Sequence, residues 1–124
     1  MNILIVDDHA DMRRMLKHVI AVGIGNISGV TECENGEQAI SLYHSLKPDC
    51  VLMDIELDTM SGFEAVEKIM QTDSGAKVVI VTSHNNPLFK TKAEELKVQG
   101  FVSKDKLIEL VPILNTLSKQ YRAL

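Results

Sequence analysis

Two apolar runs of the chain end directly on aspartate. The run ILIV is followed by Asp7 and Asp8, with a further carboxylate at Asp11, and the run VLM is followed by Asp54. Continuous apolar runs of this kind are typical of strands buried in a parallel sheet. Two like charges about 4 Å apart repel by about 4 kcal/mol at the effective dielectric of a protein surface. Carboxylates gathered at the ends of buried strands therefore need a cation or must hold protons.

Other apolar runs also end on residues that could take part in chemistry. Thr82 and Ser83 close one run, and Lys104 follows another. In an open α/β sheet the functional crevice lies beyond the carboxyl ends of the strands, at the point where the strand order reverses. With the strand order 2-1-3-4-5, the first and third strands flank that point. We therefore expect the three strand-end aspartates to meet there, with Thr82 and Lys104 alongside.

The donor atoms of this cluster indicate a hard divalent cation. The expected ligands are the carboxylates of Asp7, Asp8 and Asp54, and Lys104 can offset only one of their three charges. An all-oxygen set without His or Cys favours Mg²⁺, or Mn²⁺, over zinc. The sequence therefore predicts a magnesium or manganese site.

The same residues predict phosphoryl chemistry. Mg²⁺ commonly binds through a few carboxylates together with phosphate oxygens. A carboxylate can also be the nucleophile that forms an aspartyl phosphate. Asp54 is the candidate phosphoacceptor, because it stands alone after the central expected strand. Lys104 would pair with one phosphoryl oxygen, and the Thr82 hydroxyl would donate to another.

Apolar runs and helical patterns alternate along the chain. The expected strands are Asn2–Val6, Ile27–Cys33, Cys50–Met53, Lys77–Val81 and Gly100–Ser103. Two apolar sets recur at helical spacing: Met12, Met15, Leu16, Val19 and Ile20, and Phe63, Val66, Ile69 and Met70. Buried strands separated by helices indicate a parallel sheet covered on both faces. The expected fold is a doubly wound, flavodoxin-like (βα)5 α/β domain with a five-stranded sheet.

Three segments carry more local signals. Asn35, with Gln38 three residues later, resembles a capping box that opens the second helix. The segment Asn86–Gln99 has a weak apolar stripe (Leu88, Leu96 and Val98), so its helix is expected to be short or mobile. Pro112 lies inside the fifth helical pattern, where proline removes an amide donor. That helix is expected either to kink at Pro112 or to begin its regular part there.

Composition limits the classes of protein to consider. The 124 residues suit one domain, 1–124, with a single good core. A net charge of −4 disfavours nucleic-acid binding by this domain, because an acidic surface repels phosphate backbones. No apolar run approaches a membrane span, and no signal peptide is evident. Cys33 and Cys50 are too few for a disulfide framework, so we expect a cytoplasmic protein with no membrane association.

Taken together, these motifs resemble the receiver domain of two-component response regulators, a family that includes single-domain chemotaxis regulators. The likeness covers the whole chain. It rests on the pair Asp7-Asp8, Asp54, Gly62 eight residues later, Thr82 with the small Ser83, and Phe101 three residues before Lys104. Each motif is weak alone, and their order and spacing together are specific.

The resemblance implies a phosphorelay function. Asp54 would receive a phosphoryl group from a sensor histidine kinase or a histidine phosphotransfer protein. Asp8, Asp54 and the backbone carbonyl of Glu56 would hold Mg²⁺, with Asp7 acting through water. Ser83 would join Thr82 and Lys104 in binding the phosphoryl group. Such a domain catalyses its own phosphorylation and slow dephosphorylation, but is not a conventional multiple-turnover enzyme.

The resemblance also implies how the domain switches. Thr82 and Phe101 would form the switch pair. Glu56 and His84, two residues after Asp54 and Thr82 respectively, occupy positions that tune dephosphorylation. The other histidines show no metal-ligand spacing and are expected on the surface.

An output surface is expected on the fourth helix, fifth strand and fifth helix. On the fifth helix, Ile108 and Ile113 fall outside the expected core stripe. Apolar residues that flank a core stripe indicate a surface to be covered by a second copy or another partner. A homodimer through this face is one such outcome.

Two residues depart from the family pattern. Asp105 follows Lys104 where many receivers have proline, and Asp58 stands where proline is frequent.

Two other functions also remain open. The stretch VLMDIELDT is close to the nucleophile loop of haloacid-dehalogenase phosphatases, although their nucleophile follows the first strand. A receiver that never accepts phosphate is the second alternative, although no acidic residue of the set, nor Lys104, is missing.

Overall fold

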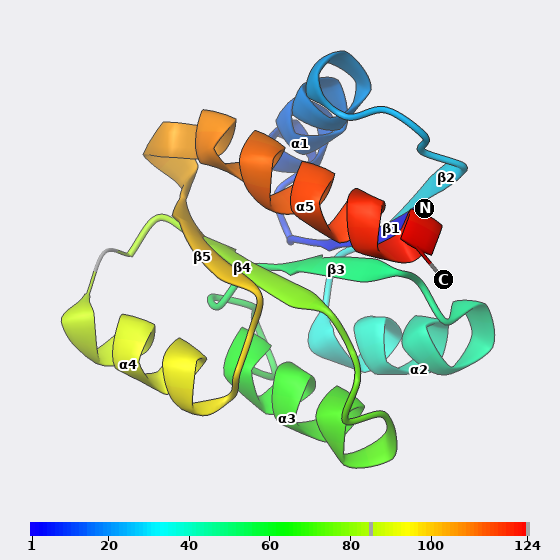
Figure 1. Cartoon of the computed structure of the whole chain (residues 1–124). Coiled ribbons are helices and arrows are strands. Elements are labelled where there is room, and N and C mark those ends of the chain that lie inside the picture. The colour runs from blue at the N-terminus through cyan, green and yellow to red at the C-terminus, as the bar shows by residue number, and fades with distance from the viewer. Residues whose placement is uncertain (85, 124) are drawn as a thin grey trace.

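Five parallel strands form one sheet in the order β2-β1-β3-β4-β5, as Figure 1 shows. The computed structural model describes residues 1–84 and 86–123, and the side chains among them up to residue 119. The elements are β1 Asn2–Val6, α1 Ala10–Gly23, β2 Gly29–Cys33, α2 Gly36–Leu46, β3 Cys50–Met53, α3 Gly62–Thr72, β4 Val78–Thr82, α4 Pro87–Glu95, β5 Gly100–Ser103, η1 Lys104–Glu109 and α5 Leu110–Ala123. The predicted fold class and strand order are confirmed.

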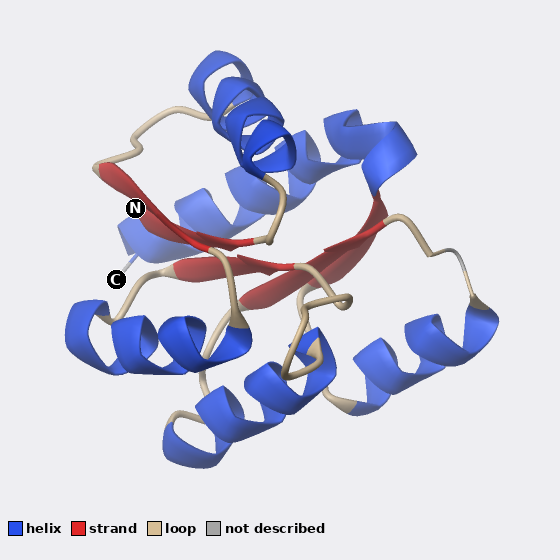
Figure 2. Cartoon of the chain, turned by 180° about the vertical axis from the view of Figure 1, so that it is seen from behind, coloured by secondary structure: helices blue, strands red, loops and turns tan. Residues whose placement is uncertain are grey.

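The helices cover both faces of the sheet. Figures 1 and 2 show α1 and α5 on one face and α2, α3 and α4 on the other. Successive side chains of a strand point to opposite faces, so β1 contributes to two hydrophobic clusters. Leu4 and Val6 pack toward α2 and α3, whereas Ile3 and Ile5 pack toward α1 and α5. Burial on both faces explains why the strands are continuously apolar.

Side-chain caps set the starts of three helices. Asn35 Oδ1 accepts the Gln38 N–H at 2.8 Å, and Ser61 and Asn86 cap α3 and α4 in the same way. The Gln38 side chain returns the bond, accepting an N–H at 3.2 Å from Glu34 rather than from Asn35. The capping box predicted from Asn35 and Gln38 is therefore confirmed, except that the Gln38 side chain bonds to the residue before Asn35 and not to Asn35 itself.

Two strand boundaries differ from prediction. β2 begins at Gly29 rather than Ile27, and β4 runs from Val78 to Thr82 rather than from Lys77 to Val81. The cause at β4 is its register with β5, which pairs Thr82 with Ser103. The carbonyl of Lys77 still accepts the Val51 N–H at 2.9 Å, but the residue lies outside the ladder. The shift places Thr82 at the very end of its strand.

The helix α4 is short, as predicted, but the apolar stripe predicted for this segment was partly wrong. Of its nine residues, all of them described, Ala93 alone is fully buried. Leu88 was predicted to belong to the stripe and is instead 75% exposed. Phe89 takes its place, packing its ring at 5.9 Å from that of Phe63 on α3. On α1, the predicted stripe residue Met15 is likewise exposed, at 53%.

The second of the two expectations for Pro112 is confirmed. A 3-10 segment occupies Lys104–Glu109, and the regular helix begins at Leu110. Pro112 then lies in the first turn of α5, where its missing N–H leaves no helical bond unmade. Ile108 is 74% exposed, as predicted. Ile113 was also predicted to be uncovered, but it packs against the cluster under α1 and α5.

Candidate functional site

The turn between β1 and α1 holds Asp7 in a fixed position. Asp7 is 1% exposed, and its Oδ1 accepts the His9 N–H at 2.8 Å. The Asp7 carbonyl accepts a hydrogen bond from Arg13 Nη1 at 2.7 Å. Arg13 Nε in turn donates to Glu32 Oε1 at 3.1 Å. These bonds tie the turn to α1 and to the edge strand β2.

Asp54 lies beside Asp7 because β1 and β3 are neighbours. Its N–H donates to the Val6 carbonyl at 3.0 Å, and its Oδ1 accepts the Glu56 N–H at 3.3 Å. Gly62 closes the loop over it, since a Cβ at that position would lie 2.0 Å from the Asp54 carbonyl oxygen. Only glycine allows this approach, which explains why this residue type stands eight positions after Asp54.

Lys104 lies between the two buried carboxylates. Its Nζ is 2.9 Å from Asp7 Oδ2 and 3.3 Å from Asp54 Oδ2. Burial lowers the pKa of Lys104, but its interactions with Asp7 and Asp54 outweigh this effect and raise that pKa overall. Burial raises the pKa of Asp54, and the charge of Asp7 adds to the increase, while Lys104 opposes it. The ammonium therefore stays charged, and Asp54 is more basic than an ordinary aspartate.

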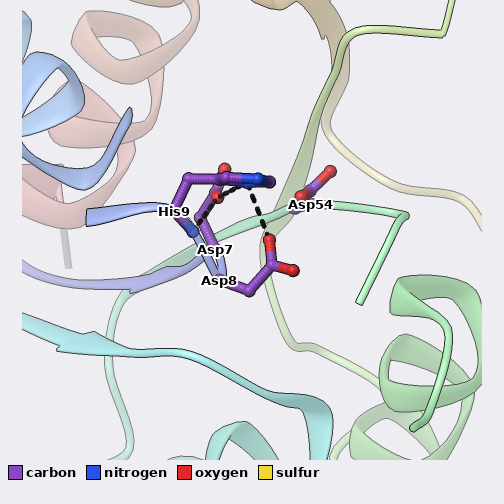
Figure 3. Close-up of side chains that lie close together, drawn as sticks. All are labelled: Asp7, Asp8, His9 and Asp54. Carbon is purple, nitrogen blue, oxygen red and sulfur yellow. Dashed lines mark hydrogen bonds and ion pairs between the residues drawn. The ribbon is translucent and has the colours of Figure 1, made fainter. Parts of the chain in front are cut away.

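Four side chains form a cluster that could hold a metal ion. Donor atoms of Asp7, Asp8, His9 and Asp54 all lie within 4.8 Å of one another. Figure 3 draws these four side chains. Among the described residues, the buried atoms Asp7 Oδ2 and Asp8 Oδ1 accept no hydrogen bond. Each has an ion-pair contact instead: Lys104 Nζ lies 2.9 Å from Asp7 Oδ2, and His9 Nδ1 lies 2.9 Å from Asp8 Oδ1. Three carboxylates beside a single ammonium leave an excess of negative charge, which fits a divalent cation.

The rim of the cluster is formed by the loops after β3 and β4. Thr82 is 1% exposed, and its Oγ1 accepts the His84 N–H at 3.1 Å, while its neighbour Ser83 is exposed. His84 Nε2 lies 2.6 Å from Glu56 Oε1, and both side chains are about half exposed. The two residues predicted to tune dephosphorylation therefore contact each other across the mouth of the site.

Phe101 lies further from the carboxylates, on the strand next to Thr82. It pairs in register with Ile80, two residues before Thr82. Residues two apart in a strand share a face, so Phe101 and Thr82 face the same side of the sheet. The partly buried Phe101 packs against the cluster under α2, α3 and α4. This arrangement suits a switch pair, whose roles remain predictions.

Sequence reasoning missed two residues of the site. His9 was placed on the surface, and it is exposed, yet its imidazole faces the carboxylates. Its position directly after Asp8 was an available signal. Arg13 was not considered, because nothing in the sequence indicates that its guanidinium reaches back to the Asp7 carbonyl.

Comparison with known proteins identifies the family. A family model described as the response regulator receiver domain matches residues 3–115. The chain belongs to this family. The resemblance inferred from the motifs is thus confirmed, and the phosphatase alternative is left without support.

Relatives of this receiver domain include single-domain and longer proteins. It is 36% identical over 118 residues to the chemotaxis protein CheY of Thermotoga maritima, covering 94% of this chain and 97% of that protein. It is 32% identical over 103 residues to the nitrate/nitrite response regulator protein NarL of Escherichia coli, covering 83% of this chain and 47% of that protein. The receiver therefore spans about half the length of the latter relative.

Solved structures agree with the fold. A LuxR-family two-component response regulator from Aurantimonas sp. SI85-9A1 superposes with a TM-score of 0.86 at 33% identity, covering 95% of this chain and 85% of that chain. A LuxR-family DNA-binding response regulator from Staphylococcus aureus gives a TM-score of 0.84 at 28% identity, covering 94% and 97%. Within the described part of the receiver, no helix is long and apolar enough to cross a membrane.

Proposed function

We propose that this receiver domain accepts a phosphoryl group on Asp54 from a sensor histidine kinase or a histidine phosphotransfer protein. The observation that carries the proposal is the position of the Asp54 carboxylate, which touches the Lys104 ammonium at 3.3 Å and lies beside Asp7 and Asp8. A nucleophilic carboxylate, a fixed cation and a metal-binding pair together suit transfer of a phosphoryl group to the carboxylate, which forms an acyl phosphate.

The transfer exchanges one bond to phosphorus for another. An Asp54 carboxylate oxygen attacks the phosphorus of the donor phosphohistidine, the P–N bond breaks, and the histidine leaves and takes a proton from solvent. Lys104 and the Thr82 hydroxyl would bind two phosphoryl oxygens, with Ser83 nearby. Mg²⁺ or Mn²⁺, held by Asp8, Asp54 and the Glu56 carbonyl with Asp7 acting through water, would supply positive charge for the phosphoryl oxygens.

Loss of the phosphoryl group would depend on the contact between Glu56 and His84. Their side chains meet at 2.6 Å across the mouth of the site, where an attacking water would enter. Glu56→Ala and His84→Ala are each expected to change the rate of dephosphorylation without preventing phosphorylation. Unchanged decay in both variants would refute this role. The domain would remain a switch that turns over slowly, not a conventional enzyme.

The switch would act through Thr82, Phe101 and the surface formed by α4, β5 and α5. A phosphoryl group beside Thr82 adds charge and acceptor oxygens, and a shift of Thr82 would free space for Phe101. The helix α4 is the element that can respond, since it buries little apolar surface. A homodimer or an output partner would cover the exposed Ile108.

The proposed setting is the cytoplasm, with a kinase or phosphotransfer protein as input partner and no membrane association. Regulators that bind DNA are among the relatives, but the acidic charge of −4 disfavours nucleic-acid binding by this domain itself.

Mass spectrometry after incubation with a small-molecule phosphodonor and Mg²⁺ tests the phosphoacceptor. The wild-type chain is expected to gain one phosphoryl group, and Asp54→Asn to gain none. Asp58→Asn is the matched control, because Asp58 is an exposed aspartate in the same loop. Equal labelling of Asp54→Asn and wild type would refute the assignment and favour a receiver that never accepts phosphate at this residue.

Hydrogen exchange with beryllofluoride and Mg²⁺ tests the output surface. Activation is expected to change exchange in α4, β5 and α5, and to strengthen self-association or partner binding. Ile108→Asp should weaken that association while leaving Asp54 labelling intact. Changes confined to α1 and α2 would refute this route of switching.

A further inference from the structure

His9 stands at the edge of the acidic cluster, directly before the first turn of α1. It is the N-cap residue of α1, but its side chain makes no capping hydrogen bond. Its imidazole is 71% exposed, with Nδ1 at 2.9 Å from Asp8 Oδ1 and 3.4 Å from Asp7 Oδ1. Its backbone is fixed by the bond from its N–H to Asp7 Oδ1. Figure 3 shows the ring turned toward the carboxylates.

These distances suit a shared coordination shell. Metal–oxygen bonds of about 2.1 Å place neighbouring ligands of an octahedron about 3.0 Å apart and opposite ligands about 4.2 Å apart. The 2.9 Å between His9 Nδ1 and Asp8 Oδ1 matches neighbouring ligands. The donor atoms of His9, Asp8 and Asp54 lie within 4.8 Å of one another, which places His9 beside the two side chains expected to hold the ion.

We propose that His9 is a ligand of this metal site, binding through Nδ1, and that it extends the site to transition-metal ions such as Cu²⁺, Ni²⁺ and Zn²⁺. The inference rests on the metal site of the proposed function and adds a nitrogen donor to the expected all-oxygen set. Imidazole nitrogen suits Cu²⁺, Ni²⁺ and Zn²⁺, whereas Mg²⁺ and Mn²⁺ prefer oxygen ligands. His9 therefore raises affinity for transition metals and contributes little to Mg²⁺ binding.

A second imidazole near the mouth of the site has to be separated from His9. His84 Nε2 contacts Glu56 Oε1 rather than the cluster, and its donor atom is not among the four that converge. His18 is a further exposed histidine, on α1. Alanine variants of these two residues distinguish the proposed ligand from a rival imidazole and from nonspecific binding.

Pulsed electron paramagnetic resonance of bound Cu²⁺ tests the ligand directly. The wild-type chain is expected to show coupling of Cu²⁺ to a nitrogen nucleus, and so are the variants His18→Ala and His84→Ala. His9→Ala should lose the coupling while keeping its melting temperature in EDTA. Calorimetric affinities for Ni²⁺ and Zn²⁺ should fall by about tenfold or more in His9→Ala, and the Mg²⁺ affinity should change by less than about twofold.

Three results would overturn the inference: absence of nitrogen coupling in the wild type, its persistence in His9→Ala, or its loss in His84→Ala. Equal loss of Mg²⁺ and Ni²⁺ affinity in His9→Ala would also count against it, since that indicates a general disturbance of the turn. If Mg²⁺ bound normally but nitrogen coupling were absent, only the role of His9 would fail. If Asp8→Asn bound every ion as well as wild type, the proposed metal site itself would fail.

Discussion

Replacing Lys104 by methionine in the metal-free protein would leave Asp7 and Asp54 buried without their ammonium partner. The side chain of Lys104 is 13% exposed, and those of Asp7 and Asp54 are 1% and 4% exposed. Methionine keeps most of the length and apolar surface of the lysine stem. The change therefore removes a charge while disturbing packing little.

The cost of this change follows from the two distances. At an effective dielectric near 20, charges 2.9 and 3.3 Å apart attract by about 6 and about 5 kcal/mol, respectively. Desolvation of the ammonium cancels much of this gain, and breaking a buried pair costs about 3–5 kcal/mol. The loss has an upper limit, because one of the two aspartates can take up a proton instead of staying charged. Protonating an ordinary carboxyl at pH 7 costs about 4 kcal/mol. We expect Lys104→Met to lower the free energy of unfolding by about 3 kcal/mol.

Urea denaturation in EDTA at pH 7 measures this loss. Introducing Asp54→Asn removes one of the two buried charges, so the cost of Lys104→Met should fall by about 1–2 kcal/mol in that background. Lys106→Met is the control, because Lys106 is exposed on the same segment. A loss below about 0.5 kcal/mol, or the same loss with and without Asp54→Asn, would refute the electrostatic account.

Further outcomes are expected from the same structure. Asp8→Asn should raise the melting temperature in EDTA, because it relieves repulsion, and should reduce the stabilisation by Mg²⁺ measured by calorimetry. Gly62→Ala should lower the free energy of unfolding by about 3 kcal/mol, measured in urea, because its Cβ would meet the Asp54 carbonyl at 2.0 Å. The Tyr43 hydroxyl donates a hydrogen bond to Asp73 at 2.6 Å and lowers the pKa of that carboxyl in the folded protein. The bond therefore stabilises the folded state at pH values above the pKa that Asp73 has in the unfolded chain. This stabilisation is lost as the pH falls through the lower pKa of Asp73 in the folded protein. Tyr43→Phe should therefore lower the free energy of unfolding by about 1 kcal/mol at pH 7 and by progressively less below about pH 4. Urea denaturation at a series of pH values measures this loss.

The grouping of the polar residues could be predicted because parallel topology decides it. In a sheet of order 2-1-3-4-5, the residues after β1 and β3 must lie side by side, whatever the details of packing. Asp7 and Asp54 needed only this argument. Lys104 follows the edge strand β5, two strands away from β3, and its long side chain brings Nζ to both carboxylates. Their chemical roles rest on types and distances, and await the experiments above.

The direction of individual side chains could not be predicted in the same way. Leu88 and Phe89 are adjacent apolar residues of a nine-residue helix, too short for periodicity to choose the docked one. The choice depends on Phe63, whose ring Phe89 meets. Ile113 is likewise covered because Gly100 lets it approach β5, with its Cδ1 only 2.8 Å from where a Cβ would stand. Such contacts depend on tertiary packing between distant segments.

The pairing of α1 with α5 has a consequence for the order in which the chain acquires its structure during synthesis. Leu16 and Ile20 of α1 share a hydrophobic cluster with Leu110 and Leu114 of α5, the last element of this receiver domain in chain order. The partners of β1, by contrast, are complete once β3 has emerged. The apolar side chains of α1 are thus synthesised early but are buried only after α5 has been synthesised. Contacts between residues so distant in sequence form slowly. A nascent chain that stalls before α5 exposes these side chains, and exposed apolar surface of this kind makes folding intermediates prone to aggregation.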